Sequence, residues 1–234
     1  MNITLITGGS SGLGFEIAAI LVKKGTNVLL VSRSTEKLNA AKLKLTGSGS
    51  GQVDIFSCDI SNENTVNKLF KYITDKQYQV NYLYNAAGIG MYSSIDSITA
   101  GDIEKIFNSN LTGLILVCKT FINHLIQNAD GSRIINILST AALKGKKMES
   151  VYYAAKWGAR GFSESLKDEL SDTKTEVISV YPGGMKTAFW DESKSGYNTS
   201  NFMNAGDVAN IITEIALNKN IYISEITINR PKDK

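Results

Sequence analysis

The stretch that decides the fold is residues 3–14, which read Ile-Thr-Leu-Ile-Thr-Gly-Gly-Ser-Ser-Gly-Leu-Gly. The apolar start predicts a buried strand, the glycines predict a tight turn, and the amphipathic residues 15–24 predict a helix. A helix N-terminus carries free N–H groups and the positive end of the helix dipole, so it binds phosphate where no side chain stands in the way. Gly8 allows the sharp turn out of the strand, and Gly12 and Gly14 allow backbone and ligand to approach closely. We therefore predict that this turn holds a pyrophosphate.

The spacing of the glycines distinguishes between kinds of phosphate site. A P-loop needs Lys-Ser or Lys-Thr after its last glycine, whereas Phe15-Glu16 follows Gly14. The common dinucleotide pattern G-x-G-x-x-G is also absent, and the chain has T-G-x-x-x-G-x-G from Thr7 to Gly14. A nucleoside triphosphatase is therefore disfavoured, and the alternative to a dinucleotide site is a glycine-rich turn without a ligand.

Size and composition are those of an ordinary globular domain. The chain has 234 residues, of which 43% are hydrophobic and 20% charged, and its net charge of +3 gives no reason to expect nucleic acid as a partner. No apolar run approaches the ~18 residues of a membrane span. The first strand begins at Asn2 or Ile3, which leaves no room for a signal peptide. Cys58 and Cys118 have no metal or redox spacing, and His124 is the sole histidine. We therefore expect a cytoplasmic protein with reduced cysteines, no metal and no membrane partner.

Strand-like and helix-like segments alternate along the whole chain. Strands are predicted at residues 3–6, 27–32, 53–58, 82–84, 133–138, 176–181 and 221–228, and helices at residues 15–24, 35–45, 63–76, 99–128, 150–171 and 207–218. Such alternation implies right-handed crossovers and a mostly parallel seven-stranded sheet with helices on both faces. We therefore predict an α/β fold, a single doubly wound domain over residues 1–234, with no repeat and no linker.

Small and polar residues gather where the predicted strands end. They are Gly8–Gly14, Ser32-Arg33, Asp59, Asn85–Gly88, Ser139 and Pro182–Gly184. Ligands of doubly wound sheets bind at the carboxyl ends of the strands, near the point where the strand order reverses. The sequence therefore predicts one ligand site at this edge of the sheet.

Three residues have the chemistry of a catalytic site. Ser139 follows the strand 133–138, and Tyr152 and Lys156, four positions apart, share one face of the helix 150–171. A Lys ammonium beside a phenol favours the phenolate, and lowering a tyrosine pKa of about 10 by roughly three units needs about 4 kcal/mol. We therefore expect the ammonium, together with a positively charged oxidised nicotinamide in a desolvated cleft, to lower the pKa of Tyr152, so that it exchanges protons near neutral pH while Ser139 donates a hydrogen bond to a carbonyl oxygen.

The pattern Tyr-x-x-x-Lys is a weak signal by itself, because the chain contains it twice. Tyr72 and Lys76 form a second pair in a predicted outer helix. Ser139 stands 13 residues before Tyr152, whereas the equivalent position before Tyr72 is Asp59, which has no hydroxyl group. We assign no function to the Tyr72 pair.

Together these segments resemble the short-chain dehydrogenase/reductases in their compact form. The matching segments cover nearly the whole chain in the right order: Thr7–Gly14, Asn85–Gly88 with Ala86 in place of a second asparagine, Asn110–Gly113, Ile135–Ser139, Tyr152–Lys156 and Pro182–Thr187. The resemblance implies a Rossmann-like fold and an oxidoreductase that transfers a hydride between a nicotinamide cofactor and a carbonyl compound.

The resemblance also implies roles for single residues. Tyr152 would be the general acid in reduction, and Lys156 would also hold the nicotinamide ribose. Ser139 would position the carbonyl, and Asn110, which alone is read as a helix-distorting or capping residue, would anchor a water in a proton relay. Cofactor contacts are implied for Gly8, Ser10, Ser11, Gly12, Leu13, Gly14, Asp59, Ile60, Asn85, Ala86, Ala87, Tyr152, Lys156, Pro182, Gly183, Met185 and Thr187.

Ser32 and Arg33 decide which cofactor is expected. An acidic residue at the end of the second strand would bind the ribose diol and repel a 2′-phosphate, but this chain has Val31-Ser32-Arg33 there. A guanidinium suits phosphate, and such charge-assisted hydrogen bonds are worth roughly 1.5–3 kcal/mol each. We therefore predict NADP(H) rather than NAD(H) as the cofactor, the alternative for Arg33 being a solvated loop cation.

The segment 188–205 joins the strand 176–181 to the last helix and carries several aromatic residues, among them Phe189, Trp190 and Tyr197. We predict that it is a lid over the substrate, and its aromatic side chains favour a hydrophobic or aromatic carbonyl compound. The alternative is that they pack against the sheet or a partner subunit.

The function that these features predict is an NADPH-dependent carbonyl reductase. One alternative is an NAD-linked alcohol dehydrogenase, which Ser32-Arg33 disfavours. Another is a non-catalytic dinucleotide-sensing module, which the presence of all four catalytic side chains disfavours. The resemblance further implies a homodimer or homotetramer that pairs through the helices 99–128 and 150–171.

Overall fold

Seven strands form one sheet in the computed structural model of the chain, which describes residues 1–192 and 195–231. Every strand pair is parallel, and the order β3-β2-β1-β4-β5-β6-β7 reverses its direction of growth between β1 and β4. The strands are β1 Asn2–Thr7, β2 Val28–Ser32, β3 Val53–Ser57, β4 Gln79–Asn85, β5 Ser132–Ile137, β6 Thr175–Pro182 and β7 Glu225–Ile228. The predicted doubly wound α/β fold is confirmed. Residues 193 and 194 of the predicted lid and residues 232–234 of the predicted domain lie outside the described residues.

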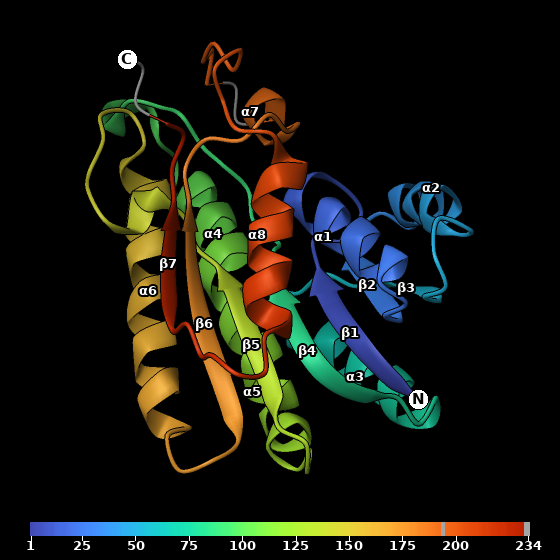
Figure 1. Cartoon of the computed structure of the whole chain (residues 1–234). Coiled ribbons are helices and arrows are strands. Elements are labelled where there is room, and N and C mark those ends of the chain that lie inside the picture. The colour runs from blue at the N-terminus through green and yellow to red at the C-terminus, as the bar shows by residue number, and fades with distance from the viewer. Residues whose placement is uncertain (193–194, 232–234) are drawn as a thin grey trace.

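Helices cover both faces of this sheet, as Figure 1 shows. The helices are α1 Gly12–Lys23, α2 Thr35–Leu45, α3 Glu63–Asp75, α4 Ala100–Phe107, α5 Gly113–Ile126, α6 Ser150–Glu169, α7 Phe189–Glu192 and α8 Ala205–Leu217. The buried residues of α1, α2 and α8 pack on one face, and those of α3, α5 and α6 pack on the other. The short helix α7 lies at the end of the molecule toward which the strand arrows point (Figure 1).

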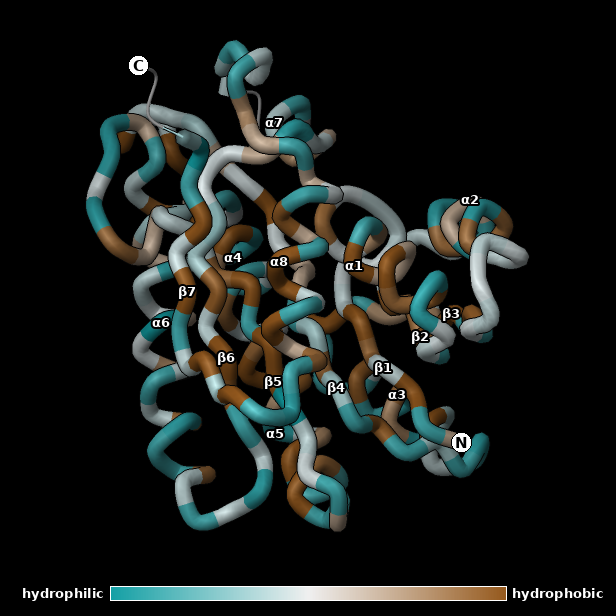
Figure 2. The backbone as a smooth tube through the Cα atoms, in the orientation of Figure 1, coloured by the Kyte–Doolittle hydropathy of each residue, from teal (hydrophilic) through white to brown (hydrophobic). Residues whose placement is uncertain are grey.

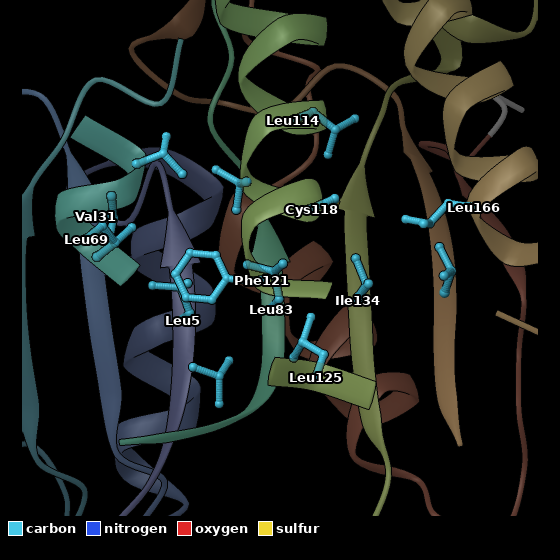
Figure 3. Close-up of a cluster of buried hydrophobic side chains, with 14 of the residues drawn as sticks. Leu5, Val31, Leu69, Leu83, Leu114, Cys118, Phe121, Leu125, Ile134 and Leu166 are labelled. Atoms are coloured by element: carbon cyan, nitrogen blue, oxygen red, sulfur yellow. The ribbon is translucent and has the colours of Figure 1, made fainter. Parts of the chain in front are cut away.

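The strands hold the two layers together because successive side chains of a strand point to opposite faces of the sheet. Leu5 of β1 belongs to the cluster that contains Phe121 of α5, and the next residue, Ile6, belongs to the cluster that contains Ile17 of α1. Figure 3 shows the first cluster, with Phe121 lying close to Leu5 and Leu83. The strands accordingly form the apolar centre of the molecule in Figure 2.

The backbone is helical throughout residues 100–126, in agreement with the helix predicted over residues 99–128, and the helix is distorted at Asn110. The structure has α4, then a π-helical turn over Asn108–Thr112, and then α5. The side-chain amide of Asn110 donates to the carbonyl oxygen of Ile106 at 3.0 Å, and so uses an acceptor that the α-helical backbone would need. This turn brings Asn110 to the edge of the ligand site described below.

The last strand begins at Glu225, later than the predicted residue 221. The side chain of Asn218 accepts the amide hydrogens of Asn220 and Ile221, which forms a turn after α8. The Tyr222 hydroxyl donates to the carbonyl oxygen of Val177 at 2.7 Å and so attaches this segment to β6 through a side chain. The apolar residues 221–223 are therefore a connection and not a strand.

Candidate active site

A cavity of about 580 Å³ lies at the carboxyl ends of the strands, where the strand order reverses. That volume is typical of a ligand pocket. The predicted site residues that line it are Gly8, Ser10, Ser11, Gly12, Leu13, Gly14, Ser32, Arg33, Asp59, Ile60, Ala86, Ala87, Ser139, Tyr152, Lys156, Pro182, Gly183, Met185 and Thr187. The lining does not include Asn85 or Asn110. The structure thus brings together residues from the ends of six strands, and their roles stay predictions.

The glycine turn between β1 and α1 has the close approaches that the sequence indicates. Gly8 has a φ of 68°, and a Cβ atom placed on it would lie 2.8 Å from the backbone of Ala87. A Cβ atom on Gly14 would lie 2.5 Å from the carbonyl oxygen of Gly8. Larger residues at these two positions would therefore clash with the backbone of the turn. Packing within the chain alone is thus enough to require glycine at both positions.

The N-terminus of α1 lacks the side-chain cap that the N-termini of α2 and α8, on the same face of the sheet, both have. The side chains of Ser34 and Asn204 accept backbone N–H groups at the starts of α2 and α8, whereas Ser11 makes no such bond at the start of α1. The first N–H groups of α1 therefore face the cavity without a side-chain acceptor. This cradle fits a pyrophosphate by its shape and by the helix dipole.

The ends of β2 and β3 form one wall of the cavity. Arg33 is exposed there, and no ion pair joins it to any other described residue. The carboxylate of Asp59 accepts hydrogen bonds from the Ser61 amide at 3.0 Å and the Ser61 hydroxyl at 2.7 Å. This wall therefore presents the Arg33 guanidinium to the cavity. The nearby Asp59 carboxylate is hydrogen-bonded to Ser61 within the turn that follows β3.

Asn85 faces away from the cavity. Its side-chain amide donates to Asn136 at 2.9 Å and to the Cys118 sulfur at 3.4 Å, and Asn136 in turn donates to Ser163 of α6 at 2.9 Å. This chain of buried polar groups joins β4, β5 and α6. Ala86 and Ala87, which follow Asn85, line the cavity, and their amide groups donate to Thr7.

Ser139, Tyr152 and Lys156 come together at the centre of the cavity. Ser139 follows β5, and its hydroxyl oxygen accepts the Ala141 amide at 3.0 Å. Its hydrogen is then available to Tyr152, to which it is hydrogen-bonded. The ammonium of Lys156 lies 5.9 Å from the centre of the Tyr152 ring and donates to the carbonyl oxygen of Ile137 at 3.2 Å. Tyr152 and Lys156 are both buried.

The groups of the chain alone raise the pKa of Tyr152; the lowering expected with an oxidised nicotinamide beside the phenol stays a prediction. Burial raises this pKa, and the hydrogen bond from Ser139 offsets the increase only in part. Burial also lowers the pKa of Lys156 to about 8. The Lys156 ammonium by itself therefore does not lower the pKa of Tyr152. Tyr152 is therefore a protonated phenol that is ready to donate a hydrogen bond.

Asn110 lies behind this group, in the π-helical turn. Its amide donates to the carbonyl oxygens of Ile89 and Ile106 at 2.9 and 3.0 Å. Its carbonyl oxygen is buried without a hydrogen-bond partner and lies 2.7 Å from the place where a Cβ atom on Gly88 would stand. The Lys156 ammonium is 3.6 Å from the same place. A buried acceptor this close to an ammonium fits a water bridge between Asn110 and Lys156.

The opposite wall is aromatic and includes two residues that the sequence analysis missed. Phe189, Trp190 and Phe202 of the predicted lid line the cavity, as do Tyr153 and Glu149. Tyr153 and Glu149 are sequence neighbours of Tyr152, and that adjacency is the signal that could have found them.

No three potential metal ligands come together within residues 1–192 and 195–231. In the same ranges, none of the helices combines the length and the apolar character that crossing a bilayer requires.

Comparisons with known proteins agree with this geometry. The family model described as short chain dehydrogenase matches residues 2–198. A human 3-oxoacyl-[acyl-carrier-protein] reductase is 33% identical over 200 residues, which are 86% of this chain and 82% of the relative. The crystal structure of a short-chain dehydrogenase/reductase from Vibrio parahaemolyticus has a TM-score of 0.86 and 32% identity over 99% of this chain and 98% of that one. A metagenomic short-chain oxidoreductase in complex with NADP has a TM-score of 0.84 and 26% identity, and the match covers 100% of this chain and 98% of that one.

The fold and the cavity define a doubly wound α/β protein with its ligand site at the carboxyl edge of the sheet. Since the family model and a relative above 30% identity both cover most of the sequence, the chain belongs to the short-chain dehydrogenase family. It is an oxidoreductase of that family.

Proposed function

We propose that this oxidoreductase is an NADPH-dependent carbonyl reductase that interconverts a ketone or aldehyde and the corresponding alcohol. The observation that carries the proposal is the grouping of Ser139, Tyr152 and Lys156 in one cavity with the open N-terminus of α1. The fit of a dinucleotide rests on the N-terminus of α1, which lines the cavity and where Ser11 makes no capping bond. The reductase name of the human relative and the NADP complex of the metagenomic neighbour are consistent with it.

In the proposed reaction, an NADPH held by the glycine turn of Gly8–Gly14 and by Lys156 would supply the hydride for the carbonyl carbon. Tyr152 gives its phenolic proton to the carbonyl oxygen, so the product leaves as a neutral alcohol. Ser139 donates a hydrogen bond to the same oxygen and so stabilises the charge that develops on it. A raised pKa for Tyr152 keeps the proton in place before the reaction, and Lys156, with a pKa of about 8, replaces it afterwards through a water held by Asn110.

We infer NADPH rather than NADH from Arg33. Its guanidinium is exposed at the cavity wall beside the end of β2, where a 2′-phosphate would lie. We expect Arg33→Asp to weaken NADPH binding by about 10- to 100-fold, because a charge-assisted contact becomes a repulsion, and to leave NADH binding nearly unchanged. The ratio of the two dissociation constants measures this, and an unchanged ratio would make Arg33 a solvated loop cation.

The experiment that tests the proposed function is a panel of carbonyl compounds with the purified protein, followed by the loss of NADPH absorbance and repeated with NADH. The panel should contain aromatic ketones, aliphatic aldehydes and a 3-oxoacyl thioester. Turnover with NADPH in the panel is the expected result. Faster turnover of alcohols with NAD⁺ would favour the alcohol dehydrogenase alternative, and dinucleotide binding without any turnover would favour the sensing module.

We also propose that the protein forms a homodimer or homotetramer through its α4–α5 and α6 surfaces. Ile103 of α4 is 42% exposed and Ile126 of α5 is 37% exposed, which is more apolar surface than these helices need for their own packing. Sedimentation equilibrium should give a mass of two or four chains, and a monomer at micromolar concentration would contradict the proposal.

A further inference from the structure

A group of three side chains connects the aromatic segment after β6 to the residue that precedes α6. Glu149 stands directly before α6, and its side chain is only 8% exposed. The hydroxyl of Tyr197 donates to the Glu149 carboxylate at 2.7 Å, and the Lys146 ammonium lies 3.2 Å from the same oxygen. Lys146 also lies over the Tyr197 ring, 4.0 Å from its centre. Each of these side chains therefore contacts the other two.

The charges in this group agree with the geometry. Burial lowers the pKa of Lys146, but the Tyr197 hydroxyl and the Glu149 carboxylate outweigh burial, so the pKa of Lys146 is raised overall. A carboxylate that is buried is costly unless it is paired and hydrogen-bonded. Tyr197 and Lys146 both contact one oxygen of the Glu149 carboxylate, and this contact holds the Tyr197 hydroxyl in place.

Tyr197 is the outer end of a row of aromatic rings that leads to Tyr152. The centre of the Tyr197 ring lies 5.5 Å from that of Trp190, Trp190 lies 5.2 Å from Phe189, and Phe189 lies 5.9 Å from Tyr152. The Trp190 indole nitrogen also donates to the carbonyl oxygen of Met185 at 2.8 Å. Phe189 and Trp190 of this row line the same cavity as Ser139 and Tyr152, where a carbonyl substrate would lie under the proposed function.

We propose that Glu149 is a positioning residue of this enzyme: by holding the Tyr197 hydroxyl, it keeps Phe189 and Trp190 closed against the substrate side of the cavity. Burial raises the pKa of Tyr152 and the Glu149 charge adds to the increase, but in the positioning role proposed here Glu149 acts through its hydrogen bond with Tyr197. The inference rests on the proposed function, because the wall matters for turnover only if a carbonyl compound binds beside Tyr152. We call the contact between Glu149 and Tyr197 the latch. The proposal predicts that a change in the latch alters the KM for the carbonyl substrate and leaves cofactor binding unchanged.

The contact can be tested without any substrate. The chain has two tryptophans, and Trp157 is 47% exposed on α6, away from the cavity lining. A Trp157→Phe background therefore makes fluorescence report on Trp190 alone. In that background, we expect Tyr197→Phe to increase acrylamide quenching of Trp190 at least twofold, because the ring remains but the hydroxyl that Glu149 holds is gone.

Tyr92→Phe is the matched control. Its ring packs against Tyr197 with the centres 5.4 Å apart, and its hydroxyl makes no hydrogen bond with the described residues, so the change removes a phenol oxygen from the same cluster without opening the latch. Quenching in Tyr92→Phe should equal that of the background. Equal quenching in Tyr197→Phe and in the background would overturn the proposal.

Steady-state kinetics then test the role of the latch. We expect Tyr197→Phe to raise the KM for the carbonyl substrate about tenfold, the size expected for losing a hydrogen bond to a charged group, with kcat within twofold and the KM for NADPH unchanged. Glu149→Gln combined with Tyr197→Phe should raise the KM no further than the larger of the two single changes, because both open one latch. An unchanged KM in Tyr197→Phe, or additive effects in the double variant, would overturn the positioning role. If the parent protein reduced no carbonyl compound, the proposed function would fail, while the quenching result would still decide whether Glu149 holds the wall.

Discussion

Two helices of this protein carry the same Tyr-x-x-x-Lys pair, and only one pair lies in the cavity. The Lys76 ammonium lies 5.7 Å from the centre of the Tyr72 ring in α3, and the Lys156 ammonium lies 5.9 Å from the centre of the Tyr152 ring in α6. Burial raises the pKa of both tyrosines above the ordinary value. The local geometry and the direction of the tyrosine pKa shift therefore do not distinguish the two pairs.

The two Tyr-x-x-x-Lys pairs differ in the residues that their side chains contact outside their own helices. The Tyr72 hydroxyl donates to the Asp54 carboxylate at 2.6 Å, so its proton is held by a negative charge. The Tyr152 hydroxyl meets Ser139, which is a neutral donor. Lys76 is exposed, whereas Lys156 is buried with a pKa of about 8. The four-residue spacing thus places the tyrosine and the lysine close together in both helices. We expect the contacting residues, Asp54 at Tyr72 and Ser139 at Tyr152, to determine whether the tyrosine can give up its proton.

The first prediction separates the two pairs by activity. Tyr152→Phe should lower kcat by about 10²- to 10⁴-fold, because it removes the proposed general acid, with the affinity for NADPH unchanged. Tyr72→Phe should leave kcat and KM at their parent values, since the cavity lining does not include Tyr72. Steady-state kinetics on both variants measure this difference, and similar losses in the two variants would mean that the surroundings of the pairs do not matter.

The second prediction separates the two lysines by stability. The folded pKa of Lys156, about 8, is below its unfolded value, so a charged Lys156 destabilises the fold at pH 7. This cost is complete below pH 8 and disappears as the pH rises toward the unfolded pKa of about 10.4. Lys156→Met should therefore raise the free energy of unfolding at pH 7 by about 2 kcal/mol after the loss of one hydrogen bond to Ile137.

Lys76→Met is the matched change for that experiment. Lys76 is exposed at the end of α3, so its removal should change the free energy of unfolding by less than about 0.5 kcal/mol. Urea unfolding at pH 7 and pH 9.5 measures both variants. Two results would contradict the prediction: a lower free energy of unfolding for Lys156→Met than for the parent, or an increase in that free energy that is as large at pH 9.5 as at pH 7. Either would show that burial does not lower the pKa of Lys156. Turnover should be lost in Lys156→Met alone.

The sequence predicts the place of the site better than its electrostatics. Polar residues at strand ends must meet at one edge of a parallel sheet, so the positions of Gly8, Ser139 and Tyr152 follow from the order of the elements. The pKa of Tyr152 depends on how deeply the phenol is buried, and residue spacing carries no information on burial depth. The contact of Glu149 with Tyr197 joins residues 48 positions apart through a segment without periodicity, and no local pattern predicts it.

The irregular places in the fold have the same origin. The helix predicted over residues 99–128 is present through α4 and α5, and the side chain of Asn110 competes for a backbone acceptor within it. The run 221–223 is apolar like a strand, yet Asn218 turns the chain before it can pair. In both places one polar side chain interrupts a hydrophobic pattern. The sequence indicates Asn110 as a helix-distorting residue, whereas the apolar pattern does not indicate Asn218.

The smallest expected effect concerns Asp54, which distinguishes the Tyr72 pair from the other. Burial raises the pKa of Asp54, but hydrogen bonds from Tyr72, from the Ile55 amide and from Tyr78 outweigh it, so the folded pKa lies below the ordinary value. Its stabilising contribution is then complete above the unfolded pKa of about 3.9 and is lost as the pH falls through the folded pKa. Asp54→Asn should lower the free energy of unfolding by about 1–2 kcal/mol at pH 7. This gap in unfolding free energy between parent and variant should narrow toward pH 3. Turnover should be unaffected. Denaturant unfolding at pH 7, 5 and 3 measures the gap. A gap that stays constant over this range would mean that Asp54 is not held as a carboxylate by the two tyrosines, and the contrast between the two pairs would then rest on the burial of the lysine alone.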